Sequence, residues 1–215
     1  MDSLETINLK TRQAYNQAAE RYHELFHNEM NEKEYDRSLL DSFASRFHKD
    51  SWICDAGCGP SGHIGRYVFD KGIQVVGVDI SDKCIELARR YNPEMRFERG
   101  DIGRLAFADG SFEGVISYYS IIDTPKKYVN RIFSEFHRVL KPDGSLLVAV
   151  KAGLTKGYLD NLLGIKVEIY LALFTEKEIT RYFEQAGFLL EFIEKRNPYD
   201  FEISNERIFA IGKKK

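Results

Sequence analysis

Apolar positions in the first 48 residues repeat with the spacing of helices. In the segment TRQAYNQAAERYHELF, spacings of three and four place one apolar stripe on Tyr15, Ala18, Ala19, Tyr22, Leu25 and Phe26. A second stripe of this kind predicts a helix from Glu34 to Phe47. No strand pattern comes before these segments, so we expect residues 1–48 to form an N-terminal helical cap.

From Trp52 onward, short β-branched or apolar runs alternate with helical patterns. Helices are expected at 64–69, 82–91, from Thr124–Pro125 to 140, and from a capping box at Thr175–Glu178 to Gly187. Strands are expected at 52–56, 73–78, 95–98, 112–119, 146–150, 188–195 and 207–211. This alternation predicts an α/β domain over residues 49–215, with a mostly parallel sheet covered by helices on both faces. The last two strands have no helix between them and are expected to pair antiparallel.

Three connections have features of their own. Thr124 is expected to cap a helix whose first residue is Pro125, and Lys141 to Gly144 (KPDG) is expected to be a turn. Residues 152–174 do not fit a simple crossover and are interpreted as an insertion near one end of the sheet.

Composition and charge narrow the class of protein. The chain has 215 residues, a net charge of −2 and 43% hydrophobic residues, which is typical of a globular domain. A dedicated nucleic-acid-binding protein is usually strongly basic. The three cysteines form no CxxC motif, the N-terminus lacks an apolar stretch, and no run could span a bilayer. We therefore expect a cytoplasmic protein without a membrane or nucleic-acid partner.

The clearest motif is the glycine-rich segment Asp55-Ala-Gly-Cys-Gly-Pro-Ser-Gly62, between a predicted strand and a predicted helix. Gly57 and Gly59 permit a tight turn and let a ligand lie against the backbone. The helix N-terminus that follows supplies free N–H groups. This context favours a nucleotide-binding loop over a simple turn.

Two acidic residues follow at the ends of the next strands. Asp79 lies 79 − 57 = 22 residues after Gly57, close to the spacing of an acid that binds ribose hydroxyls; it could also cap the next helix. Asp101, in Gly100-Asp101-Ile102, could accept a hydrogen bond from an adenine amino group while the next N–H donates to the ring. The alternative for Asp101 is an Asx-turn.

These motifs, together with HRVLKPDGSLLVAV at 137–150, resemble the class I S-adenosylmethionine-dependent methyltransferases, most closely the small-molecule ubiquinone/menaquinone type. The resemblance implies a Rossmann-like sheet of seven strands with an antiparallel last strand, and S-adenosyl-L-methionine as cofactor. It also implies cofactor contacts from the N-terminal helix, the glycine loop and the strand ends, at Tyr15, Tyr22, Asp55, Gly57, Cys58, Gly59, Asp79, Ile80, Asp101, Ile102, Ser117 and Tyr118.

Candidates for a catalytic group lie just after the fourth strand. Asp123 could act as a general base and Tyr119 lies close to it in sequence. Similar sequences are expected to have histidine at the position of Asp123, so a histidine-base mechanism does not carry over. Asp123 and Thr124 could instead only cap the next helix.

Other reactive residues have simpler interpretations. His23 and His27 are one helical turn apart, but no third ligand is evident and no metal site is expected. Cys54, Cys58 and Cys84 are interpreted as small residues packed in the core.

The sequence thus predicts an enzyme that methylates an O, N or C atom of a small aromatic or apolar acceptor, acting as a monomer or homodimer. The acceptor is expected between the N-terminal helices and residues 152–174. Two alternatives stay open: an NAD(P)-dependent oxidoreductase on the same kind of sheet, and a non-catalytic S-adenosylmethionine-binding protein. RNA or protein methylation is disfavoured by the mild acidity of the chain and by the absence of the Asn-Pro-Pro-Tyr signature of amine methyltransferases after the fourth strand. The similar string Asn197-Pro198-Tyr199 follows the sixth strand and is interpreted as a turn.

Overall fold

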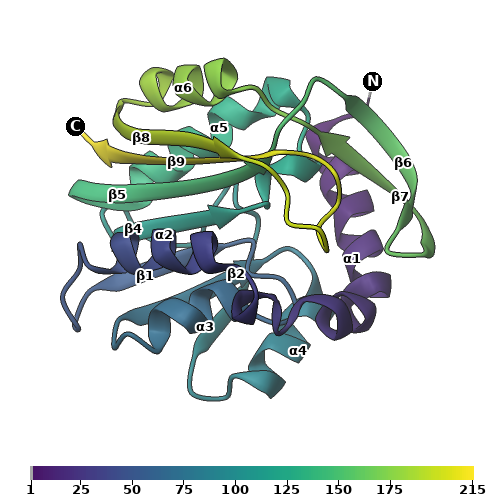
Figure 1. The fold of residues 1–215 in the computed structure, drawn as a ribbon, viewed down its shortest axis with the longest axis horizontal. Helices are drawn as coiled ribbons and strands as arrows, with labels where there is room; N and C mark the ends of the chain where they lie inside the picture. The colour runs from purple at the N-terminus through teal and green to yellow at the C-terminus, as the bar shows by residue number, and fades with distance from the viewer. Residues whose placement is uncertain (1) are drawn as a thin grey trace.

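A seven-stranded sheet forms the centre of the molecule, which a computed structural model describes for residues 2–215 (Figure 1). The strand order is β3-β2-β1-β4-β5-β9-β8. The pairs from β3 to β5 are parallel, and β9 is antiparallel to both of its neighbours. This confirms the predicted fold. The strands are β1 (Trp52–Ala56), β2 (Gln74–Asp79), β3 (Arg96–Arg99), β4 (Phe112–Tyr118), β5 (Leu140–Lys151), β8 (Phe188–Arg196) and β9 (Arg207–Lys214).

Helices cover both faces of this sheet and bury its apolar side chains. On one face, Leu40, Val68 and Ile85 pack from the first group of helices against the strands. On the other, Phe136 and Phe183 do so from the second group. The first group is α2 (Glu34–Ala44), α3 (His63–Phe69) and α4 (Asp82–Tyr91), and the second is α5 (Lys126–Val139) and α6 (Glu176–Gln185); two short 3₁₀ helices are η1 (Glu29–Asn31) and η2 (Ile121–Asp123).

The N-terminal helix α1 (Leu4–Phe26) lies beside the sheet, between α4 and a separate β-hairpin (Figure 1). The hairpin consists of β6 (Lys156–Leu162) and β7 (Ile165–Ala172). Ala14 packs with Val167 and Ile169 of β7. Ala19 packs with Cys84 and Leu87 of α4. Small residues on α1 therefore allow close approach to an element on each side.

The hairpin is how the structure resolves residues 152–174, which the sequence did not predict to contain strands. Most residues of β6 are exposed, so the buried/exposed alternation that identifies a strand is missing there. Only β7 buries a face, through residues such as Val167 and Ile169.

Three local predictions were wrong. Helix α5 begins at Lys126 with Pro125 as its N-cap, and no side chain makes a capping hydrogen bond, so Thr124 is not a cap. The segment 141–144 is not a turn before the strand but part of β5. Phe112 pairs with Leu140 and Gly114 with Ser145, so the intervening residues form a bulge, in which Asp143 has a φ of 64°. The helix expected to end at Phe47 ends at Ala44.

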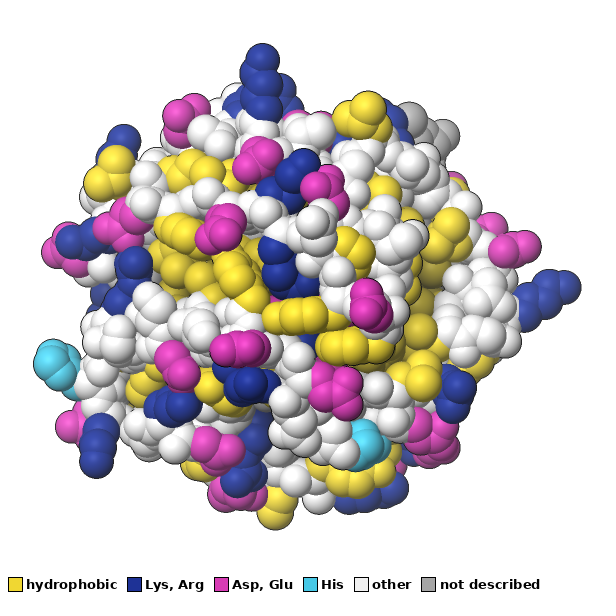
Figure 2. Space-filling model, in the orientation of Figure 1, with side chains coloured by type: hydrophobic (Ala, Val, Ile, Leu, Met, Phe, Trp, Pro, Cys, Tyr) yellow, Lys and Arg dark blue, Asp and Glu magenta, His cyan; other side chains and the backbone are white. Residues whose placement is uncertain are grey.

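Surface charge is mixed on the face shown in Figure 2, where basic and acidic side chains are interspersed. None of the helices in residues 2–215 combines the length and the apolar character needed to cross a bilayer.

Candidate active site

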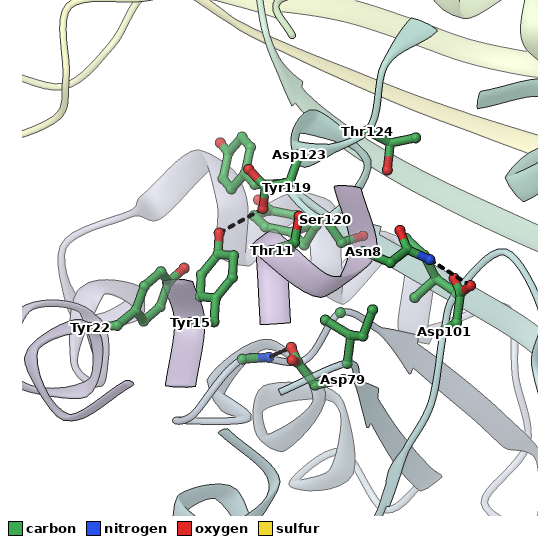
Figure 3. Close-up of a pocket in the computed structure, with 15 residues that line it drawn as sticks. Asn8, Thr11, Tyr15, Tyr22, Asp79, Asp101, Tyr119, Ser120, Asp123 and Thr124 are labelled. Atoms are coloured by element: carbon green, nitrogen blue, oxygen red, sulfur yellow. Dashed lines mark hydrogen bonds between the residues drawn. The ribbon is translucent and has the colours of Figure 1, made fainter. Parts of the chain in front are cut away.

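A pocket opens where β1, β2 and β4 end and where the loop after β3 begins (Figure 3). Ligand sites of open α/β sheets typically lie at this edge. Helix α1 contributes side chains from one side, and the segment from β4 through η2 contributes from the other. The lining consists of Asn8, Thr11, Tyr15, Tyr22, Gly57, Gly59, Asp79, Ile80, Asp101, Ile102, Tyr118, Tyr119, Ser120, Asp123 and Thr124.

The glycine loop forms the floor of this pocket, and its conformation requires glycine. Gly57 has a φ of 88°, and its N–H donates to the carbonyl of Val78 at 2.7 Å. A Cβ at this position would lie 2.2 Å from Cβ of Ser120, a distance that real structures do not tolerate. Gly59 has a φ of 63°. Because these two residues have no side chain, a ligand can lie against the backbone of the loop.

Asp79 presents its carboxylate to the pocket from the end of β2. One carboxylate oxygen accepts from the N–H of Gly59 at 3.0 Å, and the other accepts from that of Ser81 at 2.8 Å. The cap of α4 is Ser81, whose hydroxyl accepts from the N–H of Cys84. Burial raises the pKa of Asp79 to about 6, although these N–H donors oppose the shift. Its position joins the glycine loop to the second strand.

Asp101 contacts both its own loop and helix α1. One carboxylate oxygen accepts from the N–H of Gly103 at 2.7 Å, which is the Asx-type contact considered above. The other accepts from the side-chain amide of Asn8 at 2.8 Å, as Figure 3 shows. Asp101 therefore takes part in a local turn and also lines the pocket.

Asp123 lies in η2 and faces helix α1 across the pocket. The phenol of Tyr15 donates to its carboxylate at 2.8 Å (Figure 3). Burial raises the pKa of Asp123 to about 7, while the Tyr15 hydrogen bond and the nearby Lys151 ammonium oppose that shift. Because α5 has no side-chain cap, Asp123 does not serve as one. Its carboxyl group can therefore accept or release a proton near neutral pH.

Three sequence-predicted contact residues do not line the pocket. Asp55 is buried under the glycine loop, where its carboxylate accepts from the N–H of Gly65 at 3.0 Å, and burial raises its pKa to about 7. Ser117 bonds through its hydroxyl to that of Ser120 at 2.7 Å. Cys58 is buried in the core beside α3 and β2. These residues support the loop and the end of β4 from behind.

Four lining residues were not predicted: Asn8, Thr11, Ser120 and Thr124. Asn8 and Thr11 could have been found, because Asn8, Thr11, Tyr15 and Tyr22 follow one another at spacings of 3, 4 and 7 on one helix face. Ser120 and Thr124 gave no such signal, since they belong to an irregular segment.

The histidines of α1 lie outside the pocket lining. The ring of His23 stacks on Tyr91 with centroids 3.7 Å apart, and its Nδ1 lies 3.0 Å from the Ser61 hydroxyl. Within residues 2–215, no group of three or more His, Cys, Asp or Glu side chains is arranged to hold a metal ion.

The charge of the lining indicates which ligands fit. Three of the lining residues are aspartates, and no lining residue is a lysine or arginine. A cationic ligand with hydroxyl and amino groups suits this set, because the carboxylates can accept its hydrogen bonds and balance its charge. The open glycine backbone adds room for such a ligand.

Comparison with known sequences shows which family the residues of this pocket belong to. The family described as "Methyltransferase domain" matches residues 54–148, which include the glycine loop, Asp79, Asp101 and Asp123. Residues 54–148 therefore belong to a methyltransferase domain. Its cofactor, S-adenosylmethionine, is a cation with a ribose diol and an adenine amino group, and the acidic lining described above suits it.

Curated relatives resemble the methyltransferase domain over part of their length. The malonyl-[acyl-carrier protein] O-methyltransferase of Enterobacter lignolyticus is 32% identical over 135 residues, 62% of this chain and 50% of the relative. The demethylmenaquinone methyltransferase of Beutenbergia cavernae is 33% identical over 113 residues, 53% of this chain and 45% of the relative. The chain thus spans about half the length of these relatives.

Solved structures share the fold over the whole chain. The 1,6-didemethyltoxoflavin-N1-methyltransferase of Burkholderia thailandensis, with S-adenosylhomocysteine bound, has a TM-score of 0.77 at 16% identity, covering 100% of this chain and 91% of its own. The magnesium protoporphyrin IX methyltransferase of Synechocystis PCC 6803 has a TM-score of 0.76 at 16% identity and full coverage of both chains. At such identities the likeness shows the fold alone.

Proposed function

We propose that this protein is an enzyme that transfers a methyl group from S-adenosylmethionine to an O, N or C nucleophile of a small aromatic or apolar acceptor. One observation carries the proposal: the glycine loop and three aspartates from separate segments line one pocket that contains no lysine or arginine. The relatives that support it act, by their names, on acyl-carrier-bound malonyl and on demethylmenaquinone.

Each acidic residue is assigned to one part of the cofactor. Asp79 would accept hydrogen bonds from the ribose hydroxyls, and Asp101 with Ile102 would hold the adenine. Gly57 and Gly59 would face the methionine part, with Asp55 holding the loop from below through Gly65. Tyr15 and Tyr22, from α1, would cover the cofactor from the side opposite the sheet.

The bound cofactor supplies an activated methyl group on a positively charged sulfur. The chain has to align the acceptor with that methyl, and such positioning can contribute ~7–11 kcal/mol to lowering a barrier. The rings of Tyr118 and Tyr119 lie T-shaped with centroids 5.0 Å apart and would contact the acceptor at the end of β4. When the acceptor atom carries a proton, the Asp123 carboxylate would take it, which leaves Asp123 protonated.

The rest of the molecule fits a protein of this kind. We assign residues 1–48 to a cap and 49–215 to the methyltransferase domain, with 152–174 as an inserted hairpin beside the cap. The three cysteines are free and buried, which supports a cytoplasmic location. We assign the protein no nucleic-acid partner, which the mixed charge on the face in Figure 2 supports, and a monomeric or homodimeric state.

The test is calorimetric titration of S-adenosylhomocysteine into the protein and its variants. Asp79→Ala removes at least one hydrogen bond to a charged acceptor, worth ~1.5–3 kcal/mol, so affinity should fall by at least roughly 10- to 150-fold. Gly57→Val should abolish binding, because its side chain enters the space of Ser120.

Matched controls separate the site from general destabilisation. Asp160→Ala removes an exposed aspartate of β6. Gly164→Val places valine at a φ of 87°, close to that of Gly57, but with nothing within 4 Å of its Cβ. Both controls should bind like the unchanged protein. Equal affinity in all four variants, or binding of NAD in place of S-adenosylhomocysteine, would contradict the proposal.

A further inference from the structure

Two basic side chains lie directly opposite each other at the edge of the sheet next to the pocket. Lys151, the last residue of β5, pairs in register with Arg207, the first residue of β9. Side chains of such a pair lie on the same face of the sheet, and two like charges there destabilise it. The Arg207 guanidinium accordingly helps to lower the pKa of Lys151, after burial, which is the largest cause.

No carboxylate in the described part of the chain lies within hydrogen-bonding distance of this pair, although Asp123 is near enough to Lys151 for each charge to affect the pKa of the other group. Arg207 approaches Glu202 only at 3.9 Å, and its other donors bond to the backbone carbonyls of Ile203 and Asn205. Glu202 is already bonded to Lys33 at 2.9 Å and to Arg196 at 2.7 Å. The side chain of Lys151 makes no hydrogen bond or ion pair with any other of residues 2–215. One positive charge at this edge therefore has no close partner within the chain.

Tyr119 connects this basic pair to the pocket. Its ring lines the pocket, and the Arg207 guanidinium carbon lies 5.8 Å from the ring centroid. Its hydroxyl is buried without any hydrogen-bond partner, a state that costs ~1–3 kcal/mol. Its backbone has a φ of 58°, which is strained for a residue other than glycine. A strained residue with an unused buried donor is typical of a position that contacts a ligand.

We propose that Lys151, Arg207 and the Tyr119 hydroxyl form a subsite for a carboxylate of the methyl acceptor. This inference rests on the proposed function and adds that the acceptor is an aromatic acid. The cofactor occupies the acidic pocket, and the acceptor carboxylate reaches past Tyr119 to the basic pair, which lies outside the pocket lining. Opposite charges in these two places orient the acceptor, because its anionic end is repelled by Asp79 and Asp101 and attracted by Lys151 and Arg207.

The walls of the pocket indicate that the acceptor contains an aromatic ring. Tyr15, Tyr22, Tyr118 and Tyr119 all line it, so a flat ring can stack between their faces. One carboxylate suffices to balance the uncompensated charge. A neutral ring of the same shape would leave Lys151 and the Tyr119 hydroxyl without partners.

Benzoate and benzamide are the probes, because they share shape and differ in charge. Each is titrated at pH 7.5 and constant ionic strength into the protein, with and without saturating S-adenosylhomocysteine, and binding is followed by thermal shift and calorimetry. We expect benzoate to bind at least 10-fold more tightly than benzamide, since hydrogen bonds to charged groups contribute ~1.5–3 kcal/mol. In Lys151→Gln this preference should disappear, whereas Lys49→Gln, which removes an exposed lysine before β1, should keep it.

A ligand-free measurement provides the second arm. Lys151→Gln removes a charge that lies opposite Arg207, so the variant should melt at a higher temperature than the unchanged protein. If Lys151 served only as a distant ion partner of Asp123, the variant would melt lower, and the subsite would be overturned. Equal binding of benzoate and benzamide would overturn it as well. The titrations also keep the two proposals apart: normal S-adenosylhomocysteine affinity without benzoate preference refutes the subsite alone, and absent S-adenosylhomocysteine binding refutes the proposed function.

Discussion

Two acidic residues of the pocket are buried and therefore remain protonated to a higher pH than ordinary aspartates. Asp79 and Asp123 both have a raised pKa, to about 6 and about 7, because burial penalises the charged form. The motif spacing predicted that Asp79 would lie at the end of a strand. It could not predict that Tyr15 would bond to Asp123, because the two residues are 108 positions apart and meet only through the docking of α1.

At this scale we predict that S-adenosylmethionine binding releases protons near pH 6.5. The bound cation favours the ionised form of both aspartates, so their pKa falls and affinity rises with pH through the window of about 6 to 7. S-adenosylhomocysteine lacks the sulfonium charge and should release fewer protons. Calorimetry in buffers of different ionisation enthalpy measures both numbers. Asp123→Asn should reduce the difference between the two ligands; an unchanged difference would place the sulfonium away from Asp123.

Elements of the fold differ in how well their sequence determined them. Residues 82–91 were predicted with the bounds of α4, and the capping box at Thr175 and Glu178 is present at α6. In both, local hydrogen bonding and apolar periodicity agree with the packing. The hairpin β6–β7 could not be predicted, because it is held by contacts with α1 that lie far away in sequence. Thr124 was misassigned because it ends the 3₁₀ helix η2, as its C-cap, and α5 begins only at Lys126.

Docking of α1 gives a prediction for a whole element. Ala19 is fully buried against Cys84 and Leu87, so Ala19→Leu overpacks this contact at a cost of ~1–3 kcal/mol. Hydrogen exchange should increase in residues 4–26 and stay unchanged in β1 and β4, while S-adenosylhomocysteine affinity falls as Tyr15 and Tyr22 lose their position. Glu20→Leu, at the exposed neighbouring position, serves as the control. Faster exchange throughout the sheet would mean that α1 belongs to the core and is not a separable cover.

Over the whole molecule, the buried acidic groups near the proposed cofactor site reduce the stability of the fold when they ionise. Asp55, Asp79 and Asp123 are buried carboxyl groups with raised pKa values, gathered at one edge of the sheet. Glu202, beside the pocket, is the reverse case: Lys33 and Arg196 outweigh the opposing effect of burial and lower its pKa to about 2. The three aspartates keep protons in the folded state that the unfolded chain releases. Glu202 stays ionised in the folded state at pH values at which the unfolded chain would protonate it.

These opposite shifts predict how the stability of the ligand-free protein depends on pH. A carboxyl group with a raised pKa binds more protons in the folded state, so stability falls as pH rises from about 4 to 6 through Asp79 and from about 4 to 7 through Asp55 and Asp123. Burial lowers the pKa of His23 and His137, and their smaller contribution runs the other way. The melting temperature should therefore fall between pH 5 and pH 8. Asp55→Asn, which lies outside the pocket lining, should flatten this fall.

Glu202→Gln provides the contrasting variant for the same measurement. Because the folded pKa of Glu202 is lowered to about 2, its contribution is complete above its ordinary value of 4.5 and disappears as pH falls toward 2. This variant should lose stability at neutral pH and keep the fall between pH 5 and pH 8. Saturating S-adenosylmethionine should raise the melting temperature more at pH 8 than at pH 5, because the cation binds the aspartates in their ionised form. A melting temperature that rises from pH 5 to pH 8, with or without Asp55, would show that the buried aspartates do not hold their protons.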